Sequence, residues 1–364
     1  MHLANNKVLI MAAGTGGHVF PALSIAEKLK TQSVTVEWLG TPKGLENKLL
    51  AKSDIPLHCV SVKGLRGSGI TRKLLAPIML LVALVQSIVI ILKVRPDCVL
   101  GMGGFVSGPA GVAAKLLRKP LLIHEQNAVA GFTNRLLANS ANKVFEAFPG
   151  TFDDKINAIY TGNPLRAEIL KVREKCDYAD REEIRLLVLG GSQGSAAINR
   201  IIPELIVNWT RSERLLVSHQ TGDKSFSETV SRYEEFNVLD NNKYRVAPFF
   251  IRMNEVYDWA DIVICRSGAS TISEISAIGL PSILIPYPHH SDNQQYLNAK
   301  WLIDEGAAIL IPQYELSVQR LLRVLCELLS NKERLNIMST NARSAAIRDA
   351  SEIIAQHCIE ACYE

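Results

Sequence analysis

Short apolar runs alternate with longer stretches of helical periodicity along most of the chain. The runs that read as buried strands lie at residues 8–11, 34–39, 98–100, 121–123, 185–189, 261–265 and 281–286. The first run is followed by a helical pattern as far as Lys30, and a last helical pattern covers residues 345–361. Strands that alternate with helices in this way predict parallel sheets and therefore an α/β fold.

A strand, a Gly-rich turn and a helix occur in this order twice, at residues 8–30 and 185–208. Such an internal repeat is expected of two similar doubly wound domains. A chain of 364 residues is also long for a single hydrophobic core. The polar turn at residues 161–164 is a suitable linker. We expect an N-terminal domain over residues 1–162, completed by a C-terminal helix over residues 345–364, and a C-terminal domain over residues 163–344.

Four loops rich in Gly or polar residues follow predicted strands, and each opens a predicted helix. They lie at residues 14–18, 101–109, 190–194 and 266–274. Open α/β sheets bind ligands at the carboxyl ends of their strands, and the N–H groups and dipole of a helix N-terminus attract anions. Gly lets the backbone approach a phosphate without a Cβ in the way. The helix after the second loop is expected to begin at about Ser107.

The first loop reads Gly-Thr-Gly-Gly-His and departs from known nucleotide-binding fingerprints. The third Gly of a dinucleotide fingerprint would fall at Val19, no acid follows the second strand, and no Lys-Ser/Thr completes a P-loop. An imidazole at a helix N-terminus has a lowered pKa, so His18 could act as a neutral general base. A capping or core role for His18 remains open at this point.

Metal-binding patterns are missing from the sequence. No Asp-x-Asp occurs, and the His289-His290 pair near Asp292 is better explained as a polar loop than as a metal site. Without a metal, a leaving diphosphate must be stabilised by helix dipoles, N–H groups and bases. Seven scattered Cys without a Cys-x-x-Cys pair indicate reduced thiols in a cytosolic protein, and the first residues carry no signal-peptide pattern.

Residues 55–124 hold nine bases and one acid, Asp97, so this span carries +8 while the whole chain carries only +4. The bases are Lys63, Arg66, Arg72, Lys73, Lys93, Arg95, Lys115, Arg118 and Lys119. A local basic field implies an anionic partner, either nucleic acid or anionic lipid.

Within this span, residues 74–92 are almost entirely apolar over nineteen positions. Bases flank this run, which favours a helix lying at an anionic membrane surface. A buried core helix and a membrane span are the alternatives, and Pro77, expected to break the helix in its first turn region, argues against a span.

Several motifs stand in one order along nearly the whole chain. They are Ala-Gly-Thr-Gly-Gly-His-Val-Phe-Pro at residues 13–21, the Gly-Met-Gly-Gly loop at 101–109, His-Glu-Gln-Asn at 124–127, Gly-Asn-Pro-Leu-Arg at 162–166, Gly-Gly-Ser-Gln-Gly at 190–194, the loop at 266–274 and Asp-Asn-Gln-Gln at 292–295. Together they resemble the MurG family of peptidoglycan N-acetylglucosaminyltransferases. Each loop alone is unspecific, whereas the combined set is highly specific.

The resemblance implies a GT-B fold, with two Rossmann-like doubly wound domains that face a central cleft. It implies an inverting, metal-independent and cofactor-free transfer of N-acetylglucosamine from UDP-N-acetylglucosamine to the C4 hydroxyl of the muramyl sugar of lipid I, forming lipid II for cell-wall biogenesis. It further implies a peripheral enzyme on the cytoplasmic face of the bacterial inner membrane, bound through the region from Arg72 to Lys93. Other cell-wall synthesis proteins are candidate partners, and nucleic acid is not.

The resemblance also implies site residues. His18 and Asn127 would be catalytic. The donor would contact Thr15, Gly16, Gly17, Asn127, Arg166, Ser192, Phe250, Ala269, Ser270, Thr271, Ile272, Ser273, Glu274 and Gln294. In this set Ser192 would offer its hydroxyl to phosphate, Glu274 would hold the ribose and Gln294 would read the sugar hydroxyls. The acceptor diphosphate would lie on Gly14, Gly103, Gly104 and Ser107.

Two positions depart from the family pattern. Phe250 stands where an Ile usually supports the uracil, and Phe105 replaces a frequent Tyr, so a hydroxyl contact is lost there.

Three alternatives remain. A related glycosyltransferase that acts on diacylglycerol would share the fold, although the motif at residues 124–127 favours the muramyl acceptor. A nicotinamide-dependent dehydrogenase is disfavoured by the broken fingerprint and the missing ribose acid. A membrane-binding module without catalytic activity is the third.

Overall fold

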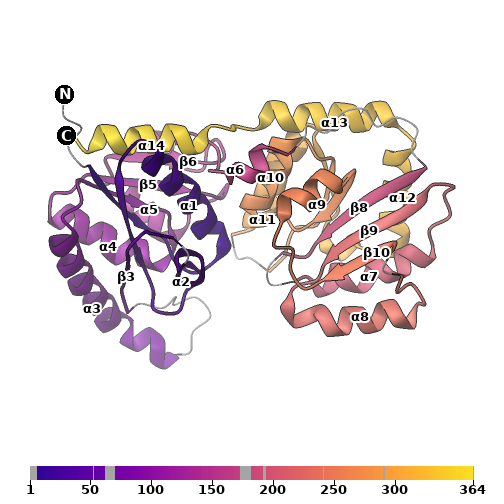
Figure 1. Cartoon of the computed structure of the whole chain (residues 1–364), viewed down its shortest axis with the longest axis horizontal. Helices are drawn as coiled ribbons and strands as arrows, with labels where there is room; N and C mark the ends of the chain where they lie inside the picture. Colours follow the sequence, from indigo (N-terminus) through magenta and orange to yellow (C-terminus); the bar gives the residue numbers. More distant parts are fainter. Residues whose placement is uncertain are drawn as a thin grey trace. The chain divides into compact units, whose positions relative to one another are not determined.

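The computed structural model describes residues 6–51, 53–61, 70–172, 182–191, 194–240, 242–289 and 292–363, and of residues 70–75 the backbone alone. Ser192 and the side chains of Arg72 and Lys73 therefore lie outside the described residues. The chain divides into two compact units, Met1–Arg166 with Ile347–Glu364, and Ala167–Ala346 (Figure 1).

The sheet of the N-terminal unit is parallel throughout and has the strand order β3-β2-β1-β4-β5-β6-β7. Its strands are β1 (Lys7–Met11), β2 (Thr35–Gly40), β3 (Leu57–Cys59), β4 (Cys98–Gly101), β5 (Leu121–Glu125), β6 (Lys143–Glu146) and β7 (Ile159–Tyr160). Its helices are α1 (Gly16–Thr31), α2 (Leu45–Leu50), α3 (Ile70–Val94), α4 (Gly104–Leu116), α5 (Phe132–Ala138) and α14 (Ala350–Ala361), with the 3-10 helix η1 (Asp154–Ile156). Because the chain winds outward from β1 and then from β4, the switch point lies between these two strands.

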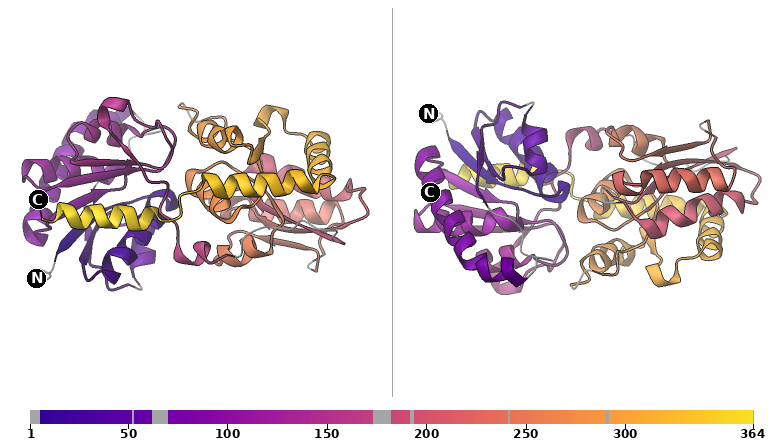
Figure 2. Two further views of the ribbon diagram at one scale, coloured as in Figure 1. Left: turned by 90° about the horizontal axis from the view of Figure 1, so that it is seen from above. Right: turned by 90° about the horizontal axis from the view of Figure 1, so that it is seen from below.

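Helices cover both faces of this sheet, which is why its central strands are apolar without alternation. One core combines residues of the sheet, α1 and α14, and includes Ile25 and Ile354, both fully buried. The other combines the sheet with α3, α4 and α5, and includes Ile91, Ala110 and Leu137. Figure 2 shows α14 in yellow lying along the N-terminal unit.

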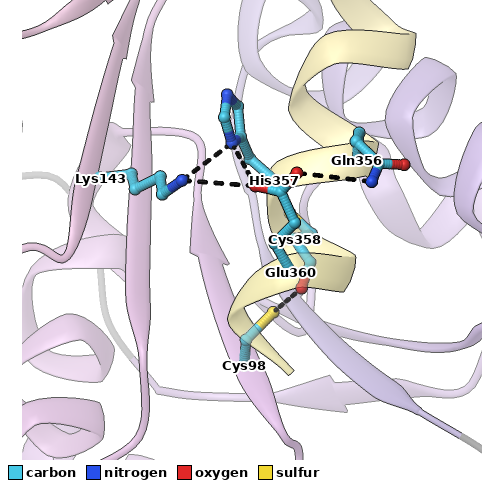
Figure 3. Close-up of polar contacts among 6 residues, drawn as sticks. All are labelled: Cys98, Lys143, Gln356, His357, Cys358 and Glu360. Atoms are coloured by element: carbon cyan, nitrogen blue, oxygen red, sulfur yellow. Dashed lines mark hydrogen bonds and ion pairs between the residues drawn. The ribbon is translucent and has the colours of Figure 1, made fainter. Parts of the chain in front are cut away.

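Polar contacts fix α14 on the sheet (Figure 3). The thiol of Cys98 on β4 donates to the Cys358 carbonyl at 3.3 Å. The Nζ of Lys143 on β6 lies 3.0 Å from His357 Nδ1 and 3.4 Å from Glu360 Oε2. The last helix thus belongs to the compact unit formed by the first part of the chain.

The C-terminal unit repeats the same topology, with a parallel sheet in the order β10-β9-β8-β11-β12-β13. Its strands are β8 (Glu183–Leu189), β9 (Arg214–Gln220), β10 (Tyr244–Ala247), β11 (Ile262–Cys265), β12 (Ser282–Leu284) and β13 (Ala308–Leu310). Its helices are α6 (Ala167–Leu170), α7 (Ala196–Val207), α8 (Phe226–Glu235), α9 (Met253–Trp259), α10 (Ala269–Ile278), α11 (Gln294–Asp304), α12 (Val318–Leu329) and α13 (Lys332–Ala345), with the 3-10 helices η2 (Asp223–Ser225) and η3 (Gln313–Glu315). The prediction of two doubly wound α/β domains is confirmed, and the switch point here lies between β8 and β11.

Helix α3 contains the long apolar run and continues through Pro77, so the expectation that this proline breaks the helix was wrong. Ala83, Ile91 and Val94 are buried against the sheet. Exposed apolar side chains recur on the opposite face at Ile78, Leu81, Val82, Val85, Val89 and Leu92. By length and composition alone Ala76–Val94 could cross a membrane, with a mean hydropathy of 2.4, but only 22% of it is buried. A helix buried on all sides is therefore excluded.

Candidate active site

Two of the Gly loops meet at the switch point of the N-terminal unit, because β1 and β4 are neighbours in the sheet. Gly14, Gly103 and Gly104 have φ values of 97°, 82° and 76°, a left-handed conformation that favours Gly. Helix α1 begins at Gly16 and α4 at Gly104, and no side chain caps either helix. Except for the His18 N–H, which donates to the Thr15 carbonyl at 3.2 Å, the N–H groups of both first turns therefore point out of the helices and can bind an anion.

His18 lies in the first turn of α1, with its ring against the second loop. A Cβ at Gly103 would lie 3.4 Å from His18 Nε2, and one at Gly104 would lie 3.9 Å from His18 Cε1. Thr15 Oγ1 lies 3.4 Å from His18 Nδ1. Burial lowers the pKa of His18, while the charge of Glu125 partly opposes this change. The imidazole is therefore neutral at pH 7 and stands between the two loops, as a general base requires.

Glu125, at the end of β5, is a buried carboxylate that organises this region. Its Oε1 accepts hydrogen bonds from the backbone N–H and the side-chain amide of Asn127, both at 3.1 Å. Its Oε2 accepts from Gly131 N and Asn134 Nδ2, both at 2.9 Å. The side chain is only 3% exposed. Four neutral donors thus hold one negative charge in place near His18.

The other two residues of the motif at 124–127 face away from the loops. His124 Nε2 lies 3.0 Å from the Gly162 carbonyl, and its Nδ1 lies 3.0 Å from Gln126 Nε2. Burial lowers the pKa of His124 to about 4, so the ring is neutral and donates to Gly162. Asn163 Nδ2 donates to the Gln126 carbonyl at 2.9 Å. His124 and Gln126 therefore anchor the segment that leads out of the N-terminal unit.

Two of the residues expected to bind the acceptor diphosphate are already occupied. Gly14 N donates to Glu46 Oε2 at 3.3 Å, and this carboxylate is fully buried behind the loop. Ser107 is fully buried, and its hydroxyl lies 2.7 Å from the Gly103 carbonyl, to which it donates. In the free protein the Gly14 amide and the Ser107 hydroxyl thus donate within the fold, and their assignment to the acceptor diphosphate stays a prediction. The N–H groups at the starts of α1 and α4 remain available to bind a phosphate.

The Ser107 hydroxyl points back into the fold because α4 begins three residues earlier than expected. With Gly104 as its first residue, Ser107 occupies the end of the first turn. A Ser at this position bonds back to the carbonyl four residues earlier instead of pointing out of the helix.

The other two loops meet at the switch point of the C-terminal unit, after β8 and β11. Gly191 and Gly194 have φ values of 79° and 78°. A Cβ at Gly194 would lie 2.3 Å from the Thr221 carbonyl oxygen, so only Gly fits there. The Ser195 hydroxyl accepts from Ile198 N at 3.4 Å and caps α7.

Helix α10 opens with donors that have no acceptor within the helix. Its N-cap is Gly268, and no side chain caps it, so the N–H groups of Ala269, Ser270 and Thr271 point out of the helix. The Ser270 hydroxyl is buried and has no hydrogen-bond partner among the described residues. Buried hydroxyls are normally hydrogen-bonded, so Ser270 is a candidate contact for a bound ligand.

Further along α10, Ile272 and Glu274 differ in the groups that they expose to a ligand. The Ile272 side chain is fully buried, and its N–H donates to the Gly268 carbonyl at 2.9 Å. The expected donor contact through Ile272 stays a prediction. Glu274 is half-buried, and its Oε2 accepts from Tyr257 Oη at 2.9 Å, which fixes the carboxylate two turns into the helix.

Phe250 is buried, and its N–H donates to Gln220 Oε1 at 2.9 Å. The guanidinium of Arg245 lies 4.9 Å from the centre of its ring. The amide is thus unavailable to a nucleobase, and backbone recognition of uracil at Phe250 is limited to the carbonyl. Gln294 is the half-buried first residue of α11.

Arg166 belongs to the N-terminal unit, where its guanidinium lies 5.0 Å from the centre of the Phe20 ring. Arg266, in the fourth loop, donates to the carbonyls of Ile285 and Pro286 at 2.9 and 3.0 Å and to Gln313 Oε1 at 2.5 Å. Arg266 therefore joins the ends of β11 and β12.

The described residues thus form two separate clusters. His18, Asn127, Gly103 and Gly104 lie together in the N-terminal unit, and the α10 residues lie together in the C-terminal unit. Sequence reasoning missed Glu46 and Asn134 and gave no role to Glu125. Among the described residues, no three His, Cys, Asp or Glu side chains gather as metal ligands would.

Comparison with known proteins places both units in one family. Residues 8–146 match the glycosyltransferase family 28 N-terminal domain, and residues 185–354 match the glycosyltransferase family 28 C-terminal domain. The UDP-N-acetylglucosamine–N-acetylmuramyl-(pentapeptide) pyrophosphoryl-undecaprenol N-acetylglucosamine transferase of Pseudomonas syringae pv. syringae (strain B728a) is 46% identical over 354 residues, which cover 97% of this chain and 98% of that protein.

Solved structures agree with this assignment. The crystal structure of MurG from Acinetobacter baumannii has a TM-score of 0.80 and 35% identity, covering 98% of this chain and 99% of that one. The glycosyltransferase of kitacinnamycin has a TM-score of 0.71 at 16% identity, covering 97% and 99%, and shows likeness of fold alone. The chain therefore belongs to the MurG family within glycosyltransferase family 28 and is a glycosyltransferase with the GT-B fold.

Proposed function

We propose that this glycosyltransferase moves N-acetylglucosamine from UDP-N-acetylglucosamine to the C4 hydroxyl of the muramyl sugar of lipid I and so forms lipid II. The curated relative at 46% identity carries a name that states this donor and acceptor. The observation that carries the proposal is the position of His18, a half-buried imidazole of lowered pKa held between two helix N-termini. A sugar hydroxyl is a weak nucleophile, so its attack needs such a base.

The donor is assigned to the C-terminal unit. The outward N–H groups of α10, the Ser270 hydroxyl and the loop at residues 190–194 are donors suited to the diphosphate of UDP. Glu274 would accept hydrogen bonds from the ribose hydroxyls, and Gln294 would contact the sugar. Thr15, Gly16, Gly17, Arg166 and Ser273 complete the proposed donor contacts.

The reaction is a single displacement that needs no metal. As the C4 oxygen attacks the anomeric carbon, its proton passes to His18, which stands neutral beforehand. The bond between the anomeric carbon and the diphosphate oxygen breaks, and UDP leaves with the electron pair. Helix N-termini stabilise the negative charge that develops on the leaving group. Asn127, fixed by Glu125, positions the reactants.

The acceptor is a membrane lipid, and α3 provides a surface for that membrane. Ile78, Leu81, Val85 and Val89 expose between 53% and 62% of their surface on one face of this helix. Val112 on α4, a helix that packs against α3, is also exposed. With the bases that flank the run, this surface suits peripheral binding to the anionic cytoplasmic face of the inner membrane.

The test is transfer of labelled sugar from UDP-N-acetylglucosamine to either of two lipids. Lipid I in vesicles should accept the label, and diacylglycerol should not. Transfer to diacylglycerol alone would replace the proposal with the related lipid glucosyltransferase function. A thermal shift with a panel of UDP-sugars would identify the donor independently of the acceptor, and UDP-N-acetylglucosamine should protect most.

A further inference from the structure

A cavity of about 280 Å³ lies beside α5 and η1 in the N-terminal unit. Arg135, Thr151, Asp153 and Lys155 line it together with apolar groups such as Phe152. Among the described residues neither Arg135 nor Lys155 forms a side-chain ion pair, so both cations are available to a ligand. Asp153 caps η1, where its Oδ1 accepts from Lys155 N at 3.1 Å. The lining therefore carries a net positive charge.

This cavity is linked directly to the proposed acceptor site. Thr151 Oγ1, on its wall, lies 3.1 Å from the Asn127 carbonyl and 2.8 Å from the Phe148 carbonyl, and it can donate to either. Arg135 follows Asn134, whose amide donates to Glu125. One wall of the cavity is thus one hydrogen bond away from the residue assigned to position the reactants.

We propose that this cavity binds the free carboxyl end of the acceptor's peptide. The inference rests on the proposed function, in which the muramyl sugar carries a pentapeptide. Five extended residues span at most about 17 Å, enough to reach the cavity from a sugar held near Asn127. A volume of about 280 Å³ accommodates one or two residues and not the whole peptide. The planar guanidinium of Arg135 matches a carboxylate with two parallel hydrogen bonds, and Lys155 adds a second charge.

The experiment uses the full-length enzyme and two soluble short-chain analogues of lipid I. One analogue ends its peptide in a carboxylate, and the other ends it in a carboxamide. Arg135→Ala and Lys155→Ala are compared with Arg323→Ala, an exposed arginine on α12 that serves as the matched control. The KM for UDP-N-acetylglucosamine, the melting temperature and binding to anionic vesicles are measured alongside.

The wild-type enzyme should show a KM about tenfold lower for the carboxylate analogue than for the carboxamide, as one charge-assisted contact provides. Arg135→Ala should abolish that difference by raising only the KM for the carboxylate, with kcat and the donor KM unchanged. Lys155→Ala should reduce the difference, Arg135→Lys should restore part of it, and Arg323→Ala should keep it.

Equal losses on both analogues, or no loss on either, would overturn the inference. Weaker vesicle binding by Arg135→Ala with an unchanged analogue preference would assign the cavity to a lipid headgroup and would also overturn it. If the wild-type enzyme transferred sugar to neither analogue nor to lipid I, the proposed function itself would fail, and this result is distinguishable from the others.

Discussion

Replacing Glu125 by Gln would separate its role from that of His18. Glu125 Oε2 is 2.9 Å from Asn134 Nδ2, and that nitrogen and His18 Nε2 both lie within 3.4 Å of one point, the Cβ position at Gly103. The carboxylate and the imidazole are therefore at most about 9.5 Å apart, and at this largest separation their attraction is about 1.7 kcal/mol at an effective dielectric constant of about 20. This attraction is felt only when His18 is protonated, that is, as it takes the proton in the transition state.

Glu125→Gln should lower kcat/KM by about fourfold if the proton is half transferred, and by about twentyfold if transfer is complete. The pH profile gives the sharper readout. His18 must be neutral to act, so activity falls as the pH drops through its pKa. The charge of Glu125 raises that pKa, and its removal should lower it, so the acid limb of kcat/KM should move to lower pH.

Glu146→Gln is the matched control for this experiment. Glu146 is also a buried carboxylate, and it accepts from Gly150 N at 3.0 Å and Phe152 N at 3.2 Å. Both variants should lose stability, because an amide nitrogen would replace an acceptor opposite buried N–H groups. Only Glu125→Gln should move the acid limb. If neither variant moved the acid limb of the pH profile, the electrostatic role of Glu125 would be refuted. If Glu125→Gln lowered kcat/KM more than a thousandfold and its pH profile had no acid limb, Glu125 itself would be the general base.

Three further outcomes follow from the geometry. Ser270→Ala should leave the melting temperature unchanged or slightly higher while raising the KM for UDP-N-acetylglucosamine about tenfold, because the hydroxyl has no partner among the described residues; an unchanged KM would remove Ser270 from the donor site. Gly194→Ala should cost at least about 2 kcal/mol more stability in urea unfolding than Gly191→Ala, because both positions have positive φ but only the Cβ at Gly194 would strike the Thr221 carbonyl; equal losses would contradict the clash. Leu81→Ser with Val85→Ser should weaken binding to anionic vesicles at least about tenfold in a sedimentation assay, with turnover of a soluble acceptor preserved; unchanged sedimentation would exclude this face of α3.

The sequence predicted that each of the four loops follows a strand and opens a helix, and the structure adds that the loops meet in pairs. Strands alternate with helices, and each half begins with an apolar run followed by Gly. In a doubly wound sheet the first and fourth strands are adjacent, so the loops after β1 and β4 must meet, as must those after β8 and β11.

Side-chain pairing between distant segments could not be predicted in this way. Glu46 lies 32 positions from Gly14, and its partners are backbone N–H groups that every residue carries. Glu125 had a neighbour of recognised importance, Asn127, yet its bonds to Gly131 and Asn134 depend on how the chain turns after β5. Buried carboxylates that bind neutral donors leave no charge pattern in the sequence.

These buried carboxylates explain why two similar switch points would serve different ligands. In the N-terminal unit, Glu46 occupies the Gly14 amide and Glu125 adds a second fixed negative charge, so an anion is favoured only at the outward starts of α1 and α4. In the C-terminal unit, α10 presents outward N–H groups and an unpartnered hydroxyl at Ser270, while Glu274 stands two turns away. A diphosphate that leaves as a dianion is better stabilised there. The acids of the first unit instead favour positive charge, which is what His18 acquires when it removes a proton.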